Sequence, residues 1–460
     1  MQTNRTRRRF LTGSATAGAI ALAGCTGGGD DEENGDEEAN GDENGEDEPG
    51  DDADTYEVWA LDQGQDTIHV YEPAGDDEFD ETETIDVNAL EGVPDEGVVP
   101  HMIDFSSDYE YAAVACTAGA RTLVFRTEDK ELVGNVETGP RTHMASFSPD
   151  DEYIHVDVIG DPDEEYGWIV RLEADFEEYE FAELDRIDFS ENEVVDEEGV
   201  WPARPICHQF TGDGRTIHTL GPAHGDGGLV IVDHDDFSVD RAYPQEEAPI
   251  NCGTMPHYED DAFYLTAGRP SNPDEGVDGI GEYYVYDTAE DEFAVEGADS
   301  AGVDAHGFWF TPDGEELWLL NRETNDGLVL DPDTNDVIEE IDEYGPATGD
   351  EPETSDAPDI MWSSPDGEYM FVTLRGPAPL SGGAHASTGV NPGFAVVDVE
   401  SRERVAVVEP DPIEEYDDEE IEAARAEDPD APRLPDFHGI GVRPVDDFDT
   451  EIPNSPAYGN

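Results

Sequence analysis

The sequence predicts an all-β fold, a seven-bladed β-propeller, and three observations support this prediction. A short phrase recurs seven times, strand-like segments follow most copies in a fixed order, and the two ends of the folded region supply complementary parts of one repeat. Repeats of about 40–50 residues with four strands each are typical of propeller blades.

The recurring phrase begins with a histidine, continues with alternating apolar residues and ends in an acidic turn. Its clearest copies are residues 101–108, 143–150, 306–314 and 359–367, the last with Asp359 in place of the histidine. Looser copies occupy residues 207–214, 255–261 and 438–444. Each copy is expected to form the first, innermost strand of a blade, with every second side chain on one face.

Further strand-like segments follow most copies, each rich in β-branched or aromatic residues and bounded by Gly, Pro, Asn or Asp. They are 111–116, 122–125 and 131–136 after the first copy, 316–320, 327–330 and 337–341 after the fifth, and 369–374, 394–399 and 404–408 after the sixth. The wider gaps, 190–203 and 410–436, are expected to be loop insertions.

The last copy, at His438, supplies one strand, and the folded region begins with three segments that lack a leading strand. These three segments are 56–61, 67–71 and 84–87. Together the four strands complete a seventh blade, which closes the ring and removes the sheet edges that would otherwise aggregate. The propeller is therefore expected to span residues 55–445, with a C-terminal tail at 446–460.

The Ser-Pro-Asp turns of these repeats resemble those of the YVTN and lactonase-like seven-bladed propellers, in which a Pro-His opening also recurs. The resemblance covers about residues 55–445 and rests on residues such as Ser364-Pro365-Asp366-Gly367. It implies the fold and leaves the function open, because one propeller fold serves many unrelated functions.

Acidic residues dominate the composition, with 118 Asp and Glu against 21 Lys and Arg and a formal net charge of −97; the single lysine is Lys130. A surface this acidic repels itself in dilute buffer, whereas in about 1 M salt the Debye length falls to about 3 Å. The composition therefore indicates a halophilic, haloarchaeal protein. Nucleic acid is excluded as an expected partner, because phosphate binding needs clustered Lys and Arg.

Residues 1–24 have the form of an export signal. Arg7 and Arg8 stand before Phe-Leu and a short apolar run that cannot span a bilayer, which resembles the twin-arginine signal for folded proteins. The following Leu-Ala-Gly-Cys box resembles the lipoprotein lipobox, which implies that Cys25 carries the lipid.

An acidic tether is expected to follow the lipidated cysteine, over residues 25–54. Of the 29 residues from 26 to 54, 15 are Asp or Glu, and the remainder are Gly, Asn, Ala, Thr and Pro. Such a segment cannot bury apolar surface and is expected to be disordered. The protein is therefore predicted to lie at the cell surface, anchored to the outer face of the cytoplasmic membrane through its lipid alone.

Seven side chains are expected to face the central channel from the inner strands. When the acidic turns are aligned, residues of matching parity are His101, His143, His208, His257, His306, Asp359 and His438, with His208 and His257 two and about four places further along. Four arginines follow the second strands of different blades and are expected at the same face: Arg121, Arg269, Arg322 and Arg375.

This pattern leaves several functions open. His and Arg at one channel mouth indicate binding of a small or anionic ligand, or of a surface protein. Several imidazoles also suit a copper, zinc or iron ion, and a spatial likeness to the propellers of nitrous oxide reductase and nitrite reductase implies a redox metalloprotein, though without a Cys-x-x-Cys-His haem motif. The lactonase-like resemblance implies a hydrolase, for which no catalytic residues are assigned. Histidines that merely begin each blade are the structural alternative, and a protein-interaction platform is a further one.

Three cysteines remain beside Cys25. Cys207 and Cys252 are expected at similar depth in the inner strands of adjacent blades, so a disulfide is one alternative and buried apolar thiols are the other. The Gly-rich segments 221–228 and 381–393, which carry His224 and His385, are expected to lie beside the channel mouth.

Overall fold

The structure is a computed structural model. It describes residues 55–75, 77–221, 227–259, 261–273, 276–349, 352–383, 385–410, 413, 416–426, 428, 431–446, 448 and 450, all within one compact unit, Ala53–Asn460. The predictions for Arg7, Arg8, Cys25, the acidic tether and His224 lie outside these residues, as does most of the C-terminal tail. In the part of the chain that is described, no helix is long and apolar enough to cross a membrane.

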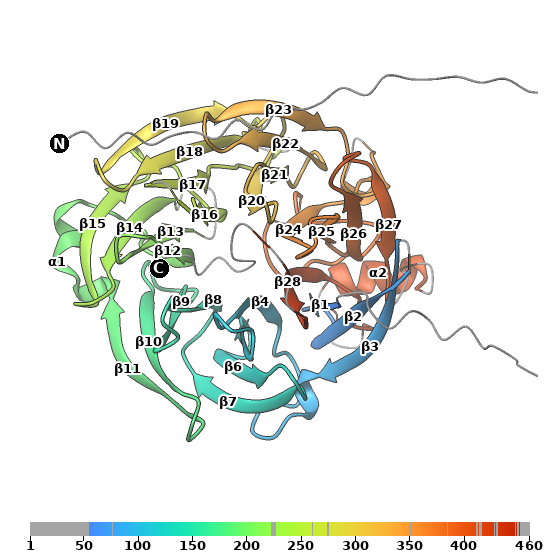
Figure 1. Ribbon diagram of the computed structural model, residues 1–460, viewed down its shortest axis with the longest axis horizontal. Coiled ribbons are helices and arrows are strands. Elements are labelled where there is room, and N and C mark those ends of the chain that lie inside the picture. The colour runs from blue at the N-terminus through green and yellow to red at the C-terminus, as the bar shows by residue number, and fades with distance from the viewer. Residues whose placement is uncertain are drawn as a thin grey trace, which may run out of the picture. The chain divides into compact units, whose positions relative to one another are not determined.

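The described residues form seven antiparallel four-stranded sheets, arranged as blades around a common centre (Figure 1). The first blade is β4 (Pro100–Phe105), β5 (Tyr111–Cys116), β6 (Arg121–Arg126) and β7 (Glu131–Glu137). The second is β8 (Thr142–Phe147), β9 (Tyr153–Val158), β10 (Trp168–Asp175) and β11 (Glu180–Asp188). The third is β12 (Pro205–Phe210), β13 (Arg215–Leu220), β14 (Gly228–Asp233) and β15 (Ser238–Pro244).

The remaining blades continue the same order of strands. The fourth is β16 (Thr254–Pro256), β17 (Ala262–Thr266), β18 (Glu282–Asp287) and β19 (Glu292–Asp299). The fifth is β20 (Ala305–Phe310), β21 (Leu317–Asn321), β22 (Asp326–Asp331) and β23 (Asp336–Ile341). The sixth is β24 (Pro358–Ser363), β25 (Tyr369–Leu374), β26 (Gly393–Asp398) and β27 (Arg404–Val408).

The seventh blade joins the two ends of the folded region, which confirms the predicted closure. Its strands are ordered β28 (Phe437–Pro444), β1 (Tyr56–Asp62), β2 (Thr67–Gly75) and β3 (Glu78–Asp86). The last of these begins six residues earlier than predicted, because its first part consists mostly of exposed acidic residues that an apolar pattern does not mark.

Short helices occupy the two predicted insertions. The first insertion contains η2 (Phe189–Glu191) and α1 (Glu193–Glu197), and the second contains α2 (Asp418–Arg425). The side chain of Asp417 caps α2 in a reciprocal capping box with Glu420, which satisfies otherwise unpaired backbone N–H groups. Two further short 3₁₀ helices are η1 (Val87–Ala89) and η3 (Pro352–Thr354).

Burial decreases from the inner strands to the outer strands. Inner strands such as β4 and β20 are buried along their whole length, whereas outer strands such as β3 and β11 expose most of their acidic residues. Apolar side chains between blades form the core, where Trp59 contacts Phe105 edge to face. The charge therefore accumulates on the rim, and the centre is left to the inner strands.

A local irregularity recurs near the start of the inner strands. In six of the seven blades the pairing register shifts within the first few residues of the inner strand, for example between Pro100 and Met102 and between Ala305 and Gly307. Such β-bulges re-aim a side chain and are frequent beside functional sites. Here they lie where the predicted channel residues begin.

Candidate functional site

One side chain from each blade meets the next at the centre of the propeller, and together they form a closed ring. This hub ring consists of His101, His143, Cys207, Cys252, His306, Asp359 and His438. All of them are buried except His143, which is partly exposed. Every member has a side chain of a type that ligates metals in proteins.

The first half of the hub ring runs through two imidazoles and two thiols. The Nε2 atoms of His101 and His143 are 3.0 Å apart. The Nδ1 atom of His143 lies 3.9 Å from the sulfur of Cys207, and the sulfurs of Cys207 and Cys252 are 3.0 Å apart. Both cysteines are free rather than joined in a disulfide.

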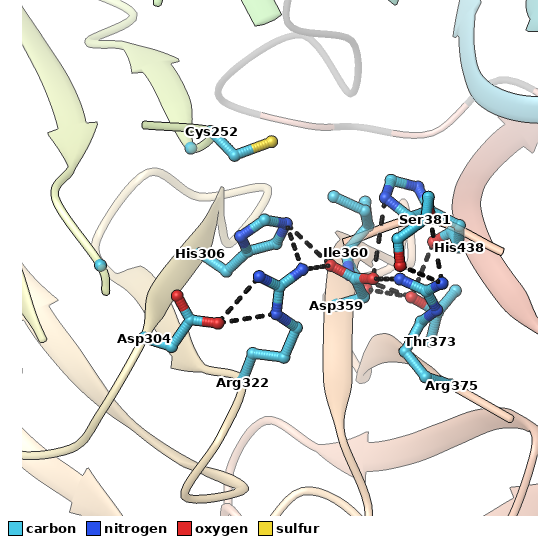
Figure 2. Close-up of polar contacts among 12 residues, drawn as sticks. Cys252, Asp304, His306, Arg322, Asp359, Ile360, Thr373, Arg375, Ser381 and His438 are labelled. Carbon is cyan, nitrogen blue, oxygen red and sulfur yellow. Dashed lines mark hydrogen bonds and ion pairs between the residues drawn. The ribbon is translucent and has the colours of Figure 1, made fainter. Parts of the chain in front are cut away.

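The second half of the hub ring is centred on Asp359 (Figure 2). Its Oδ1 atom is 2.8 Å from Nε2 of His306, and its Oδ2 atom is 3.7 Å from Nε2 of His438. The ring of His438 stacks on that of His101, with centroids 3.6 Å apart, which closes the circuit.

Glycines next to hub residues allow neighbouring inner strands to approach this closely. A Cβ atom on Gly439, which follows His438, would lie 2.5 Å from the backbone oxygen of His101. A Cβ atom on Gly253, which follows Cys252, would lie 2.5 Å from the backbone oxygen of His306. Any larger residue at these positions would push apart the strands that carry the ring.

The hydrogen bonds of His101 determine which of its nitrogens is protonated. Its Nδ1 atom lies 2.9 Å from Oε1 of Gln63. The amide nitrogen of Gln63 donates to Asp436 over 2.7 Å, so the amide oxygen must be the atom that faces His101. His101 therefore donates from Nδ1, and its Nε2 atom carries a free electron pair.

His438 has the same arrangement with a backbone acceptor. Its Nδ1 atom is 3.0 Å from the backbone oxygen of His101, which can only accept. Burial holds the pKa of His438 well below its usual value, so the ring is neutral and its Nε2 atom is bare. This bare nitrogen faces the Asp359 carboxylate, and the two electron-rich atoms repel each other unless a proton or cation lies between them.

His306 lies between the carboxylate of Asp359 and the thiol of Cys252. Burial and Arg322 act to lower its pKa, but Cys252 and Asp359 outweigh them and raise the pKa of His306 to about 9. Nε2 donates to Asp359, while Nδ1 is buried and has no hydrogen-bond partner among the described residues.

The two thiols of the ring differ in acidity. The pKa of Cys252 lies well below its usual value because Cys207 donates a hydrogen bond to it and His306 is close by. The same hydrogen bond, together with burial, raises the pKa of Cys207 well above its usual value. The pair therefore favours one thiolate, on Cys252, and one thiol.

A chain of alternating charges supports one side of the hub ring (Figure 2). Arg322 binds Asp304 over 2.8 Å and also contacts Asp359, and Arg375 binds Asp359 and, over 2.8 Å, Asp436. Burial raises the energetic cost of any unpaired charge here. Three carboxylates and the Cys252 thiolate oppose two guanidiniums and the protonated His306, which leaves one negative charge in excess and favours a cation.

A pocket of about 310 Å³ opens above the hub ring. All four histidines of the hub ring and Cys252 line this pocket. Asn251, Arg322 and the start of the Gly-rich segment, residues 381–383, also line it. That segment therefore does lie beside the channel, as predicted. His385 from the same segment is 3.5 Å from Glu323.

The structure places two of the predicted histidines away from the hub. The Nδ1 atom of His208 lies 2.8 Å from the carboxylate of Asp157, and the Nδ1 atom of His218 lies 2.7 Å from it. The three side chains form a fully buried cluster between two blades. His257 follows β16, where its ring stacks on Tyr258 with centroids 4.6 Å apart. Cys207 and Cys252 occupy the ring positions of these two blades instead.

The four predicted arginines divide in the same way. Arg322 and Arg375 contact the hub ring through Asp359. Arg121 donates to the backbone of Gly92 and Gly119, and Arg269 donates to the backbone of Asp278. In the described structure neither Arg121 nor Arg269 lines the hub pocket.

Two ring members, Cys207 and Cys252, do not follow the predicted alternation along the inner strands. In the third blade Cys207, and not its neighbour His208, reaches the hub, and in the fourth blade Cys252 lies just before β16. The expected similar depth of Cys207 and Cys252 was the signal in the sequence for both.

Comparisons with known proteins support the fold. No protein-family model and no curated protein matches the sequence. A periplasmic gluconolactonase of Pseudomonas aeruginosa is similar in structure, with a TM-score of 0.56 and 13% identity over 85% of this chain and 100% of that one. Hydrazine synthase of Kuenenia stuttgartiensis has a TM-score of 0.48 and 12% identity over 77% of this chain and 89% of that chain. The chain is thus a seven-bladed β-propeller with structural similarity to a gluconolactonase.

Proposed function

We propose that this propeller binds a transition-metal ion at the hub ring and presents it to a small ligand in the pocket above. The observation that carries the proposal is that each of the seven blades contributes one metal-ligating type of side chain to a single closed ring. Ligand atoms of His306, Asp359 and His438 all lie within 4.8 Å of one another. Nitrogen and thiolate ligands together suit copper, zinc and iron better than magnesium or calcium.

The hydrogen bonds behind the histidines support metal ligation. A ligating histidine almost always donates its second N–H to a carboxylate, a backbone carbonyl or a similar acceptor. Gln63 is this acceptor for His101, a backbone carbonyl serves His438, and Asp359 serves His306. His101 and His438 are thereby oriented with a free electron pair on Nε2, and His306 has one on Nδ1 once its second proton leaves.

The charges around the ring favour a cation over an anion. Arg322 and Arg375 are already engaged by carboxylates, and these groups together with protonated His306 and the Cys252 thiolate keep one negative charge in excess. An anion would therefore have to displace an existing ion pair. A small ligand in the pocket is better accounted for as a group that binds to the metal, with Arg322 and Asn251 at hand for polar contacts.

Metal analysis of the full chain, purified in high salt, tests this function. We expect about one equivalent of copper, zinc or iron, and its loss in the double variant His306→Ala/His438→Ala. The control His69→Ala, in β2 on an outer part of the seventh blade, should retain the metal. Failure of both wild type and control to bind any of these ions at micromolar concentration would contradict the proposal.

A second candidate function is thiol-based acyl transfer, and the acidity of Cys252 favours it. Cys252 is the nucleophilic thiolate, protonated His306 is its cationic partner, and Asp359 orients His306; Cys252 also lines the larger pocket. Iodoacetamide should then modify Cys252 rapidly in metal-free protein, and His306→Gln should slow the modification. An unreactive Cys252 in metal-free protein would dismiss this candidate.

We also propose that the protein is exported and held at the cell surface by a lipid on Cys25. The twin-arginine pattern and the lipobox support this location. Cys25→Ser should shift the protein from the membrane fraction to the culture medium. If the variant stays with the membrane, the lipid is not its anchor.

A further inference from the structure

A second, smaller cavity lies against the other side of the hub ring. It has a volume of about 50 Å³. Cys252 and His306 line both this cavity and the larger pocket, and Cys207 joins them here. The hub ring therefore lies between a pocket of about 310 Å³ and a much smaller cavity.

Methionines gather around this small cavity. The sequence has six methionines. The structure describes five of them, and four line this one cavity: Met102, Met144, Met255 and Met361. The fifth described methionine, Met370, belongs to the packed core in β25.

Their distribution is not that of ordinary core filling. Methionine commonly fills irregular gaps in a core, and such gaps would place it between the blades wherever the packing requires it. All four methionines belong to the buried apolar core, as Met370 does. They differ from Met370 in their position, because they come from the inner strands β4, β8, β16 and β24 of four different blades and all line this one cavity.

The lining of the cavity selects for one kind of ion. Thioethers and thiols are soft ligands, which prefer Cu(I) to harder divalent ions. Phe308, Trp309 and Ile360 also line the cavity, beside the polar Gln209 and Thr254, so the space is largely apolar. A singly charged ion paired with one thiolate carries no net charge, so its burial there costs far less than burial of a divalent ion. The volume admits an ion or a water molecule and excludes an organic ligand.

We propose that this cavity is a cuprous-ion site, in which Cys207, Cys252 and the surrounding methionine thioethers bind Cu(I). The inference rests on the proposed function, because the same two thiols belong to the hub ring, and it deepens that function by naming copper as the metal. The hub then offers nitrogen and oxygen ligands toward the pocket of about 310 Å³ and sulfur ligands toward the small cavity.

Competition for Cu(I) with a chromophoric chelator, under reductant and in high salt, tests the site. The variant Met102→Leu/Met144→Leu/Met255→Leu/Met361→Leu keeps the apolar volume nearly unchanged. We expect its Cu(I) affinity to fall by at least about tenfold, since removal of even an outer partner of a ligand costs roughly 10–100-fold. The matched control Met370→Leu should bind Cu(I) as the wild type does.

Zn(II) titration of the same proteins separates this inference from the proposed function. We expect the four-methionine variant to keep its Zn(II) affinity, and X-ray absorption of the Cu(I)-loaded wild type to show mainly sulfur neighbours. Unchanged Cu(I) affinity in the four-methionine variant, or a copper spectrum with only nitrogen and oxygen neighbours, would overturn the cuprous site while Zn(II) binding upholds the hub. Failure of the wild type to bind zinc, copper or iron would instead defeat the hub proposal.

Discussion

The Nε2 atoms of His101 and His143 lie 3.0 Å apart, although the two residues belong to adjacent blades. His101 donates its Nδ1 proton to Gln63, so its Nε2 atom can approach His143 only as an acceptor or as a metal ligand. In the metal-free protein, Nε2 of His143 therefore carries a proton and donates it to Nε2 of His101. A metal ion bound between the two nitrogens would take the place of that proton.

Replacement of His101 by Ala is therefore expected to weaken metal binding while the fold remains intact. The ring would lose one electron pair and the stacking partner of His438. We expect the Zn(II) affinity measured by calorimetric titration to fall at least about tenfold. His69→Ala should bind normally, and equal affinities for the two variants would show that His101 does not contact the metal.

Gln63 is expected to act on the metal only through His101. In Gln63→Leu the His101 ring loses the acceptor that orients it, and we expect a roughly 10–100-fold weaker Zn(II) affinity. Gln65→Leu is the matched control, because the Gln65 side chain lies in the same turn and bonds Tyr416 instead. If Gln63→Leu binds as tightly as Gln65→Leu, the orientation of His101 is set by something else.

Metal affinity is expected to rise with pH up to about 9. The pKa of His306 is raised to about 9, so below this pH the metal-free ring holds a proton that must leave before His306 can ligate. Each pH unit below 9 should weaken binding by up to about tenfold. Titrations at pH 7, 8 and 9 measure how the metal affinity changes with pH, and His306→Gln should flatten this dependence. If the wild-type affinity does not change over this range, His306 does not have the proposed role.

The buried cluster of Asp157, His208 and His218 is expected to stabilise the fold. Removal of one partner of a buried charge network costs about 3–5 kcal/mol, so Asp157→Asn should lower the free energy of unfolding by an amount of this order. Denaturant unfolding in high salt measures it, with the exposed Asp161→Asn as control. A loss below about 1 kcal/mol would mean that the cluster is not stabilising.

The same cluster gives stability a definite dependence on pH. The pKa of Asp157 lies below its usual value because His208 and His218 outweigh the effect of burial, and burial lowers the pKa of His218. Both groups bind more protons when unfolded, so their contribution is full near pH 7 and is lost as the pH falls below the ordinary values of histidine and then aspartate. Because Asp157 partly offsets the effect of burial on the pKa of His218, Asp157→Asn should lose more stability between pH 7 and pH 4 than the wild type; parallel curves would contradict this.

The fold could be predicted from the sequence because every blade repeats one local pattern. Alternation, turn residues and the incomplete last copy at His438 determine the seven blades and the way they close, and each feature is local in the chain. The long outer strand β3 was predicted too short because exposed acidic residues in a halophile-like composition carry no apolar alternation.

The candidate site could be predicted only in part. Parity along the inner strands identified His101, His143, His306, Asp359 and His438, which the structure brings together. It could not identify Cys207, which lies one place away from the residue of matching parity in its strand, His208. Which nitrogen of each ring is free depends on contacts such as Gln63 to His101, which join residues far apart in the chain.

Anomalous diffraction from crystals of the full chain, grown in high salt with copper and zinc supplied, tests the central claim most directly. Data collected on both sides of each metal's absorption edge would locate any bound ion. We predict an anomalous peak within the hub ring, adjacent to Nε2 of His438 and the carboxylate of Asp359. An intact ring without such a peak, in crystals of protein exposed to saturating metal, would contradict the proposal that the hub binds a transition-metal ion.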